Sequence, residues 1–244
     1  GLILGAFRWQ DETENGGGNK AANTSRTAAN PQEIRSTYLL AKLGYRPDAV
    51  HAFEFTLENL DRRLEADVLS AIAPARTSPT SVTRLTTDDE VTRRRASFDY
   101  SYRDGDNALF QLASAGLYVQ DSSNRQFADE RRNGAADRTR DNHYDERIVG
   151  VSAQFESNFG DAVAHRLVYG LDASVTDVRG LRHGTVPPAN ESFPNKPFPD
   201  TDYRLIGAFA QDEISLGNVV LIPGIRYDHF SLDPARDEPQ YTGL

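Results

Sequence analysis

A period-two alternation of apolar and polar residues recurs along this chain and constrains its fold more than any other feature. In the segment 166–175 one face carries Leu167, Tyr169, Leu171, Ala173 and Val175, and on the other face only Val168 is apolar. Successive side chains of a β-strand point to opposite faces of a sheet, so each alternating segment predicts a strand with one apolar and one polar face. Helical periodicity is hard to find. The pattern therefore predicts an all-β, antiparallel fold.

The lengths of the predicted strands and connections identify the kind of β-fold. Nine strands are predicted near residues 2–10, 34–46, 51–66, 92–103, 107–120, 145–158, 163–178, 203–215 and 219–232. Two kinds of connection alternate along the chain. Short turns are predicted at 46–49, 103–107, 159–162 and 216–218, and long polar segments at 11–31, 67–92, 121–145 and 179–202. Strands of a soluble sandwich average about 5–6 residues. The pattern indicates a transmembrane β-barrel segment rather than a soluble all-β module.

Composition is compatible with a membrane barrel and excludes several other classes. The mean hydropathy is −0.58, and no run of about 18 apolar residues exists, which excludes a helical membrane span. A net charge of −9 argues against a nucleic-acid partner. The absence of cysteine excludes disulfides and thiolate metal sites. Aromatic residues near the short turns predict an interfacial girdle: Tyr45, Phe98, Tyr100, Tyr102 and Phe155.

An odd number of strands is unsuited to closure, because bacterial single-chain barrels use even counts. We therefore expect residues 1–244 to be an internal piece of a larger barrel, with two unpaired strand edges.

The stretch "GAFAQDEISLGNVVLIPGIRYD" (207–228) carries a family resemblance. It resembles a barrel hairpin of TonB-dependent outer-membrane receptors, in which an aromatic-x-Gln-Asp-Glu strand, a short periplasmic turn and a Pro-Gly-aliphatic-Arg-Tyr-Asp strand follow one another. The matching positions are Phe209, Gln211, Asp212, Glu213, Pro223, Gly224, Arg226, Tyr227 and Asp228. Pro223 and Gly224 predict a bulge or bend, with Ile225 and Tyr227 facing lipid. The preceding "FPNKPFPDT" resembles the haem, haemoglobin, transferrin and lactoferrin receptor branch.

The resemblance implies a partial barrel of about nine strands from a 22-stranded whole, with short periplasmic turns and long outer loops. It implies a Gram-negative outer-membrane location, contact with lipid and lipopolysaccharide, and TonB acting through a plug domain that this chain does not contain. It implies transport of haem or an iron-carrying protein ligand, no intrinsic cofactor and no enzymatic activity. The alternatives are a siderophore or cobalamin receptor and, from another class, a passive porin or surface-adhesion barrel.

The histidines and charged residues offer few candidates for ligand binding. His143 and His183 fall in predicted outer loops, where an imidazole can ligate haem iron, although a solvated side chain is the default. No histidine pair has metal-site spacing. The mixed-charge stretch 128–147 predicts a solvated outer loop that meets lipopolysaccharide, or alternatively contacts a protein ligand through its arginines. Predicted cross-strand charge pairs line the lumen: Glu54, Glu58, Arg95, Asp99, Glu156, Arg166, Asp172 and Arg226.

Overall fold

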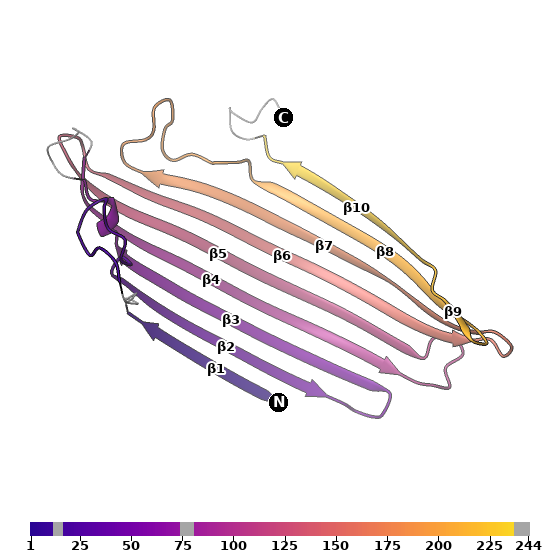
Figure 1. The fold of residues 1–244 in the computed structure, drawn as a ribbon. Coiled ribbons are helices and arrows are strands. Elements are labelled where there is room, and N and C mark those ends of the chain that lie inside the picture. Colours follow the sequence, from indigo (N-terminus) through magenta and orange to yellow (C-terminus); the bar gives the residue numbers. More distant parts are fainter. Residues whose placement is uncertain (12–16, 74–80, 237–244) are drawn as a thin grey trace.

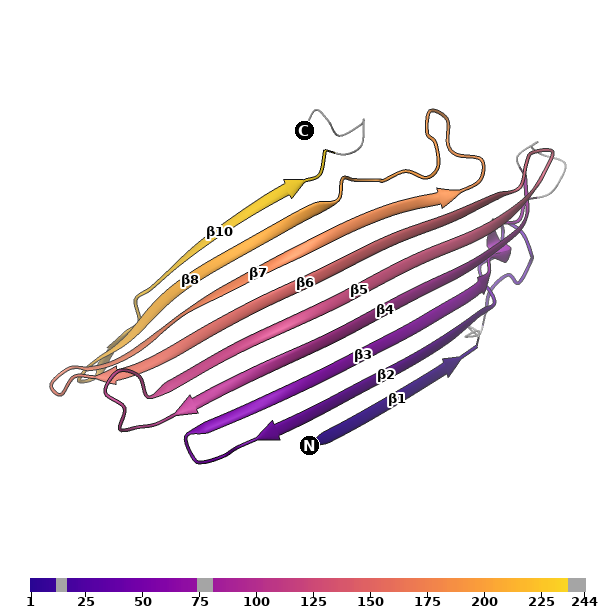
Figure 2. The same cartoon turned by 180° about the vertical axis from the view of Figure 1, so that it is seen from behind.

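The computed structural model describes residues 1–11, 17–73 and 81–236, and its strands form one curved antiparallel sheet (Figures 1 and 2). The strands are β1 (Leu2–Gln10), β2 (Gln32–Tyr45), β3 (His51–Asp67), β4 (Ser81–Arg103), β5 (Leu112–Asn133), β6 (Arg138–Phe159), β7 (Ala164–Gly184), β8 (Thr201–Leu216), β9 (Val219–Leu221) and β10 (Gly224–Pro234). One short 3-10 helix, η1 (Leu69–Ala71), follows β3. The strand order follows the sequence from β1 to β8, which then pairs with both β9 and β10.

The predicted all-β antiparallel fold is confirmed, and the connections divide between the two ends of the sheet as predicted. The turns 46–50, 160–163 and 217–218 and the connection 104–111 lie at one end, which we call the short-turn end. The segments 11–31, 68–80, 134–137 and 185–200 lie at the other, the long-loop end. Residues 12–16 and 74–80 of the predicted loops, and residues 237–244, fall outside the described part. Within that part β1 and β10 each pair on one side only, as expected of open edges.

The strands are much longer than the sequence indicated at the long-loop end. The predicted loops 67–92, 121–145 and 179–202 are wrong over 81–92, 121–133, 138–145 and 179–184, which belong to β4, β5, β6 and β7. Conversely, β5 begins at Leu112, later than the predicted 107. The added strand segments are mostly polar on both faces, so they lack the alternation by which the other strands were recognised. Their backbone ladder continues, and pairs such as Arg125–Asp141 at 2.8 Å bridge neighbouring strands.

The sheet has no hydrophobic core of its own. Among the described residues no hydrophobic side chain is buried. The accessible surface is 15668 Å², against about 10,800 Å² expected for a folded soluble monomer of this mass. A single layer that leaves its apolar face uncovered needs a nonaqueous neighbour on that face. No helix among the described residues is long and apolar enough to cross a membrane.

One face carries a continuous apolar band near the short-turn end. Its exposed members include Leu39, Leu43, Phe55, Leu57, Phe98, Leu117, Val149, Val151, Leu171, Val175 and Ile206. The aromatic residues of the predicted girdle gather next to the short turns, with Phe53, Phe110 and Tyr169 among them. There, ring centroids lie 5.1–6.2 Å apart in the pairs Tyr45–Phe53, Phe53–Tyr100, Tyr102–Phe110, Phe110–Phe155 and Phe155–Tyr169. We call this side of the sheet the apolar face.

The apolar band ends abruptly at a row of alternating charges. Arg94, Asp121, Arg147 and Asp177 are consecutive register partners on β4, β5, β6 and β7. The carboxylate of Asp121 lies 3.7 Å from Arg147, and both side chains are well exposed. Each member stands two residues beyond an apolar residue of the band on its own strand. The row therefore marks the level at which this face changes from apolar to charged.

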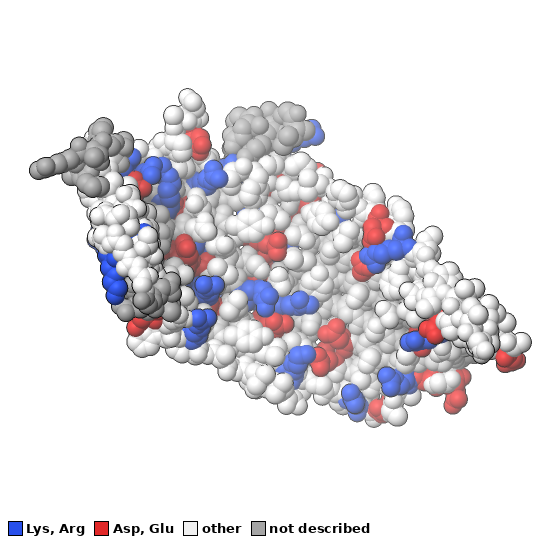
Figure 3. All heavy atoms as spheres, in the orientation of Figure 1, with Lys and Arg blue, Asp and Glu red and all other residues white. Residues whose placement is uncertain are grey.

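The opposite face is mostly polar, with exposed apolar side chains such as Leu4 and Phe230 near the two edges of the sheet, and we call it the polar face. Figure 3 shows positive and negative side chains next to one another across the middle of the sheet. The predicted charge pairs include Arg166–Glu156 at 2.9 Å and Arg226–Asp172 at 3.1 Å. Glu58 pairs with Arg93 and Glu54 with Lys42, neither of which was predicted as a partner. Arg95 instead lies over the ring of Tyr118, 4.7 Å from its centroid.

Candidate functional site

The family hairpin is built from β8, β9 and β10. The turn at Gly217 and Asn218 has two residues, and the φ of 63° at Gly217 suits the first central position of a type II′ turn. Gln211 pairs with Gly224, and Ile214 pairs with Leu221, so the register is the same on both sides of Pro223. The single strand predicted at 219–232 is wrong, because it is divided at Ile222 and Pro223 into β9 and β10, and the unchanged register shows that the predicted bulge is absent. Pro223 has no N–H to donate, while its carbonyl still accepts the Asp212 N–H at 3.0 Å.

The side chains of this hairpin alternate between the two faces. Arg226 donates to Asp228 and to Asp172 of β7, and all three lie over Gly207 on the polar face. Phe209 lies over Gly170 on the same face, because a Cβ added at Gly170 would lie 2.9 Å from the Phe209 ring.

The neighbours of these residues in the motif point the other way. Ile225 and Tyr227 are exposed on the apolar face, as predicted. Asp212 lies on the apolar face beside the short turns, where one carboxylate oxygen is 2.7 Å from Nδ1 of His165. The motif therefore joins β7, β8 and β10 within the sheet. Gln211 and Glu213 add polar groups to the polar face.

The two candidate haem ligands lie in strands, which corrects their predicted position in loops. His143 belongs to β6 and His183 to β7, and both flank Asp141, which is the register partner of His183. Nε2 of His143 is 3.0 Å from the Asp141 carboxylate. By strand alternation both imidazoles share the side of the sheet that carries the apolar band, above the charged row. They accordingly do not point toward the polar face.

Asp141 is also held by Arg125, beyond the level of the apolar band. The two N–H···O distances from Arg125 are 2.9 and 2.8 Å. This bidentate pair is the main reason that the pKa of Asp141 lies below its usual range, and His143 contributes further. His143 therefore sits in a local network of charged groups. Among the described residues no group of three or more histidines and carboxylates is arranged to hold a metal ion.

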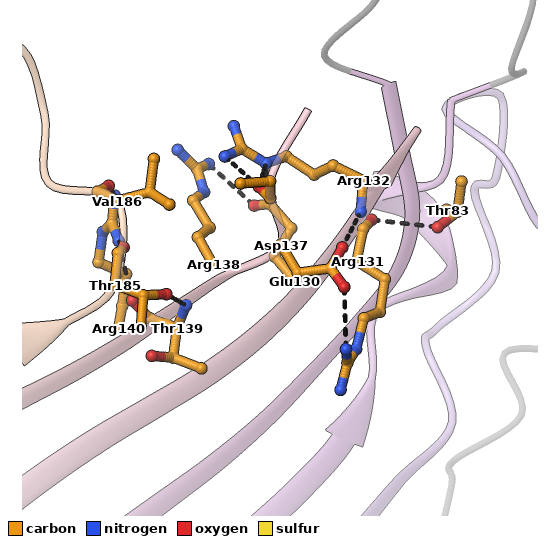
Figure 4. Close-up of polar contacts among 11 residues, drawn as sticks. Thr83, Glu130, Arg131, Arg132, Asp137, Arg138, Thr139, Arg140, Thr185 and Val186 are labelled. Carbon is orange, nitrogen blue, oxygen red and sulfur yellow. Dashed lines mark hydrogen bonds and ion pairs between the residues drawn. The ribbon is translucent and has the colours of Figure 1, made fainter. Parts of the chain in front are cut away.

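The polar face at the long-loop end carries a cluster of arginines around one carboxylate. Arg132 and Glu130 lie at the end of β5, and Arg138 and Arg140 lie at the start of β6 (Figure 4). Glu130 is the register partner of Arg138 and accepts a hydrogen bond from its Nη2 at 2.8 Å. Nε of Arg132 is 3.6 Å from the other carboxylate oxygen. We call these four residues the arginine cluster.

The hairpin turn 134–137 fixes this cluster. Arg132 donates from its guanidinium to the carbonyl of Ala136 at 2.8 Å, and its backbone N–H donates to Asp137 at 2.9 Å. Arg131, on the other side of the strand, pairs with Asp137 at 2.9 Å and extends away from Arg138 (Figure 4). The Arg132 N–H and then Arg131 lower the pKa of Asp137, so this carboxylate stays charged.

The connection 185–200 folds back over the polar face beside the cluster. Arg140 donates to the carbonyls of Thr185 at 2.6 Å and Val186 at 2.8 Å, and its guanidinium stacks 5.1 Å from the centroid of Phe193. Further along, the ring of Phe198 and the side chain of Pro197 cover Gly180 of β7, where no larger residue fits. Backbone hydrogen bonds between Arg182 and Asn195 at 2.8 and 3.0 Å tie the segment to β7.

The electrostatics of the arginine cluster favour an anion. Two guanidinium groups, those of Arg132 and Arg138, pair with Glu130, and Arg140 adds a third positive charge beside them, so the local charge stays positive even with Glu191 nearby. Partial burial, followed by repulsion from Arg138, lowers the pKa of Arg140 from its ordinary value. The sequence alone did not reveal this cluster, because Glu130, Arg132, Arg138 and Arg140 looked like members of a mixed-charge loop. The available signal was the spacing of two within each pair, which places both members on one face of a strand.

Comparison with known proteins supports the architecture. The model of a family described as "TonB dependent receptor-like, beta-barrel" matches residues 44–243. No curated protein sequence matches the chain.

Two solved structures share the fold. The ferric citrate transporter FecA in its unliganded form is 18% identical, with a TM-score of 0.53, over 83% of this chain and 30% of that chain. The copper transporter OprC is 15% identical, with a TM-score of 0.61, over 95% of this chain and 32% of that chain. The chain thus spans about a third of the length of either structure.

Proposed function

The chain belongs to the TonB-dependent receptor β-barrel family, and from this premise we propose that the intact protein is an active-transport receptor for an iron-containing ligand. Barrels of this family are outer-membrane proteins, with short turns on the periplasmic side and long loops outside the cell. In the proposed receptor, β1 to β10 form part of the wall. The arginine cluster and the connection 185–200 then belong to the extracellular rim of the lumen.

The observation that carries this proposal is the division of the sheet into two unlike faces. The apolar band is exposed and ends at the row of charges through Arg94 and Asp177, as expected of a surface that meets lipid. The polar face carries ion pairs such as Arg226–Asp172, as expected of a wall that lines an aqueous lumen or contacts a plug. In the charged row and above it, Arg147, Arg125 and other charged side chains face outward at the level of lipopolysaccharide headgroups.

The cargo is proposed from the chemistry of the extracellular rim. The resemblance over 193–232 favours haem or a haemoglobin-type iron source. The two structural neighbours are named as transporters of ferric citrate and of copper. The resemblance and both neighbours therefore agree on the transport of a metal. The positions of His143 and His183 do not favour haem ligation from the lumen. The arginine cluster suits the two propionates of haem as well as the carboxylates of a ferric siderophore or citrate chelate.

TonB dependence separates this function from its rivals. Cells that lack their own iron receptors and express the intact protein are given radiolabelled iron as haem, as ferric citrate or as a ferric hydroxamate. We expect uptake of at least one of these that stops when TonB is deleted. Uptake that continues at the same rate without TonB would instead identify a passive porin, and the absence of any uptake above background would favour an adhesion barrel.

A further inference from the structure

The arginine cluster has more hydrogen-bond donors than partners on the polar face. A guanidinium carries five N–H donors. Arg138 uses its Nη2 on Glu130, and Arg132 reaches the same carboxylate at 3.6 Å. Arg140 is occupied by the carbonyls of Thr139, Thr185 and Val186. Arg138 is therefore the member with the most unused capacity, and its side chain is 38% exposed.

Glu130 is the only carboxylate that ion-pairs with Arg132 and Arg138 among the described residues, and it is nearly enclosed. The residue is 8% exposed, and Oε1 has no hydrogen-bond partner in the described structure, although Arg132 lies near it. Its negative charge and that of Glu191, which lies close enough to act on Arg140, oppose three positive charges and leave an excess of positive charge. The excess charge is held in place by the 134–137 turn and by the folded connection 185–200, so a ligand meets guanidinium groups that are already positioned.

We propose that the arginine cluster binds the carboxylate groups of an anionic metal chelate at the extracellular rim, with Arg138 as the principal contact. Guanidinium and carboxylate match in a bidentate geometry, which gives these pairs strength and orientation. Phe193, already stacked on Arg140, adds an aromatic surface next to the charges. Lipid phosphates do not reach this site, because the cluster lies on the polar face. This inference rests on the proposed function and names the charge class of its cargo.

Arg138 and Arg131 provide a matched pair of variants for the test. They lie on the two strands of one hairpin, but Arg131 points to the opposite side and pairs with Asp137 and Asp129. Binding of ferric citrate, of haem and of a neutral ferric hydroxamate is measured on the intact protein in detergent, for R138Q, R131Q and the parent. We expect R138Q to weaken at least one anionic probe by about 10- to 100-fold, the range for a lost hydrogen bond to a charged group. R131Q should stay within about twofold.

A second variant removes the internal competitor. E130Q retains an oxygen acceptor for Arg138 but adds one net positive charge to the cluster, so anionic probes should bind more tightly and with a steeper salt dependence. If E130Q and R138Q weaken binding equally, the arginines only hold the hairpin together and the proposal is overturned. Preference for the neutral hydroxamate, or an equal effect of R131Q, also overturns it. In the uptake assay described above, uptake of every probe that continues without TonB would overturn the proposed function instead.

Discussion

Replacement of Val151 by arginine would place a charge near the middle of the apolar band. Val151 is 43% exposed, and its register partners are Leu117 on β5 and Ala173 on β7. Arg147, in the charged row of the same strand, lies four residues away. At about 3.3 Å per residue and a strand tilt of about 40° this is about 10 Å of depth. The native arginine is thus close to the edge of a band about 25 Å tall, whereas residue 151 is close to its centre.

The expected cost of V151R follows from this depth. Arginine at the bilayer midplane of a barrel costs about 2–4 kcal/mol, which falls to about 0–1 kcal/mol near the interfaces. The folding equilibrium should therefore shift by about 30- to 700-fold. Ser152 is the matched control, because it is adjacent in sequence but exposed on the polar face next to Gly116. S152R should change the free energy of unfolding by less than about 1 kcal/mol.

The assay is urea-induced unfolding of the intact protein in lipid vesicles, followed by intrinsic fluorescence and by heat-modifiable gel mobility. We expect a large loss of stability for V151R and little change for S152R. Equal stability of V151R and the parent would refute the assignment of this face to lipid. A larger loss for S152R than for V151R would show that the two faces have been exchanged.

Three further perturbations test particular contacts. G150L should displace Tyr118, whose ring occupies the space that a side chain at position 150 would need, and cost about 1–3 kcal/mol in urea unfolding; a cost unchanged when Tyr118 is also made alanine would contradict this. R140K should remove the clamp on Thr185 and Val186 and speed protease cleavage within 185–200; unchanged cleavage would show that the clamp is dispensable. Asp137 has a lowered pKa, so it stabilises the turn at neutral pH and loses that contribution as pH falls below about 4. The protection of the 132–137 amides, taken as the exchange rate relative to the intrinsic rate at each pH, should therefore fall in acid for the parent, and D137N should lack this pH dependence.

The sequence was sufficient to predict the two faces and the short-turn end of the sheet. Alternation at 166–175 depends only on the pleat of a strand, and Leu171 and Asp172 lie on the faces that it predicted. The turn at Gly217 was recognisable from its residue types. The break between β9 and β10 was not predicted, since 219–232 was expected to be one strand, although the missing N–H of Pro223 accounts for it. The unbroken register across Pro223 was not predictable either, because it is set by ladder contacts on either side.

The long-loop end could not be predicted in the same way. Outside the membrane both faces of a strand meet water, so 121–133 and 138–145 lose the apolar alternation and resemble loops. Their extended structure depends on cross-strand pairs such as Arg125–Asp141, which are distant in sequence until the register is known. The arginine cluster has the same origin. Glu130 meets Arg138 only because the turn 134–137 pairs β5 with β6 in this register.

The most direct test of the account is the environment of consecutive residues along one strand. Residues 1–244 contain no cysteine, so single cysteines at positions 147–154 of β6 can be spin-labelled one by one once any cysteine elsewhere in the intact protein is replaced by serine. Accessibility to oxygen, which concentrates in lipid, and to a water-soluble nickel chelate is then measured for the intact protein in vesicles. The account predicts a period of two, with oxygen preferred at 149, 151 and 153 and the nickel chelate at 150, 152 and 154. Preferential nickel access at every position would contradict a wall between lipid and lumen.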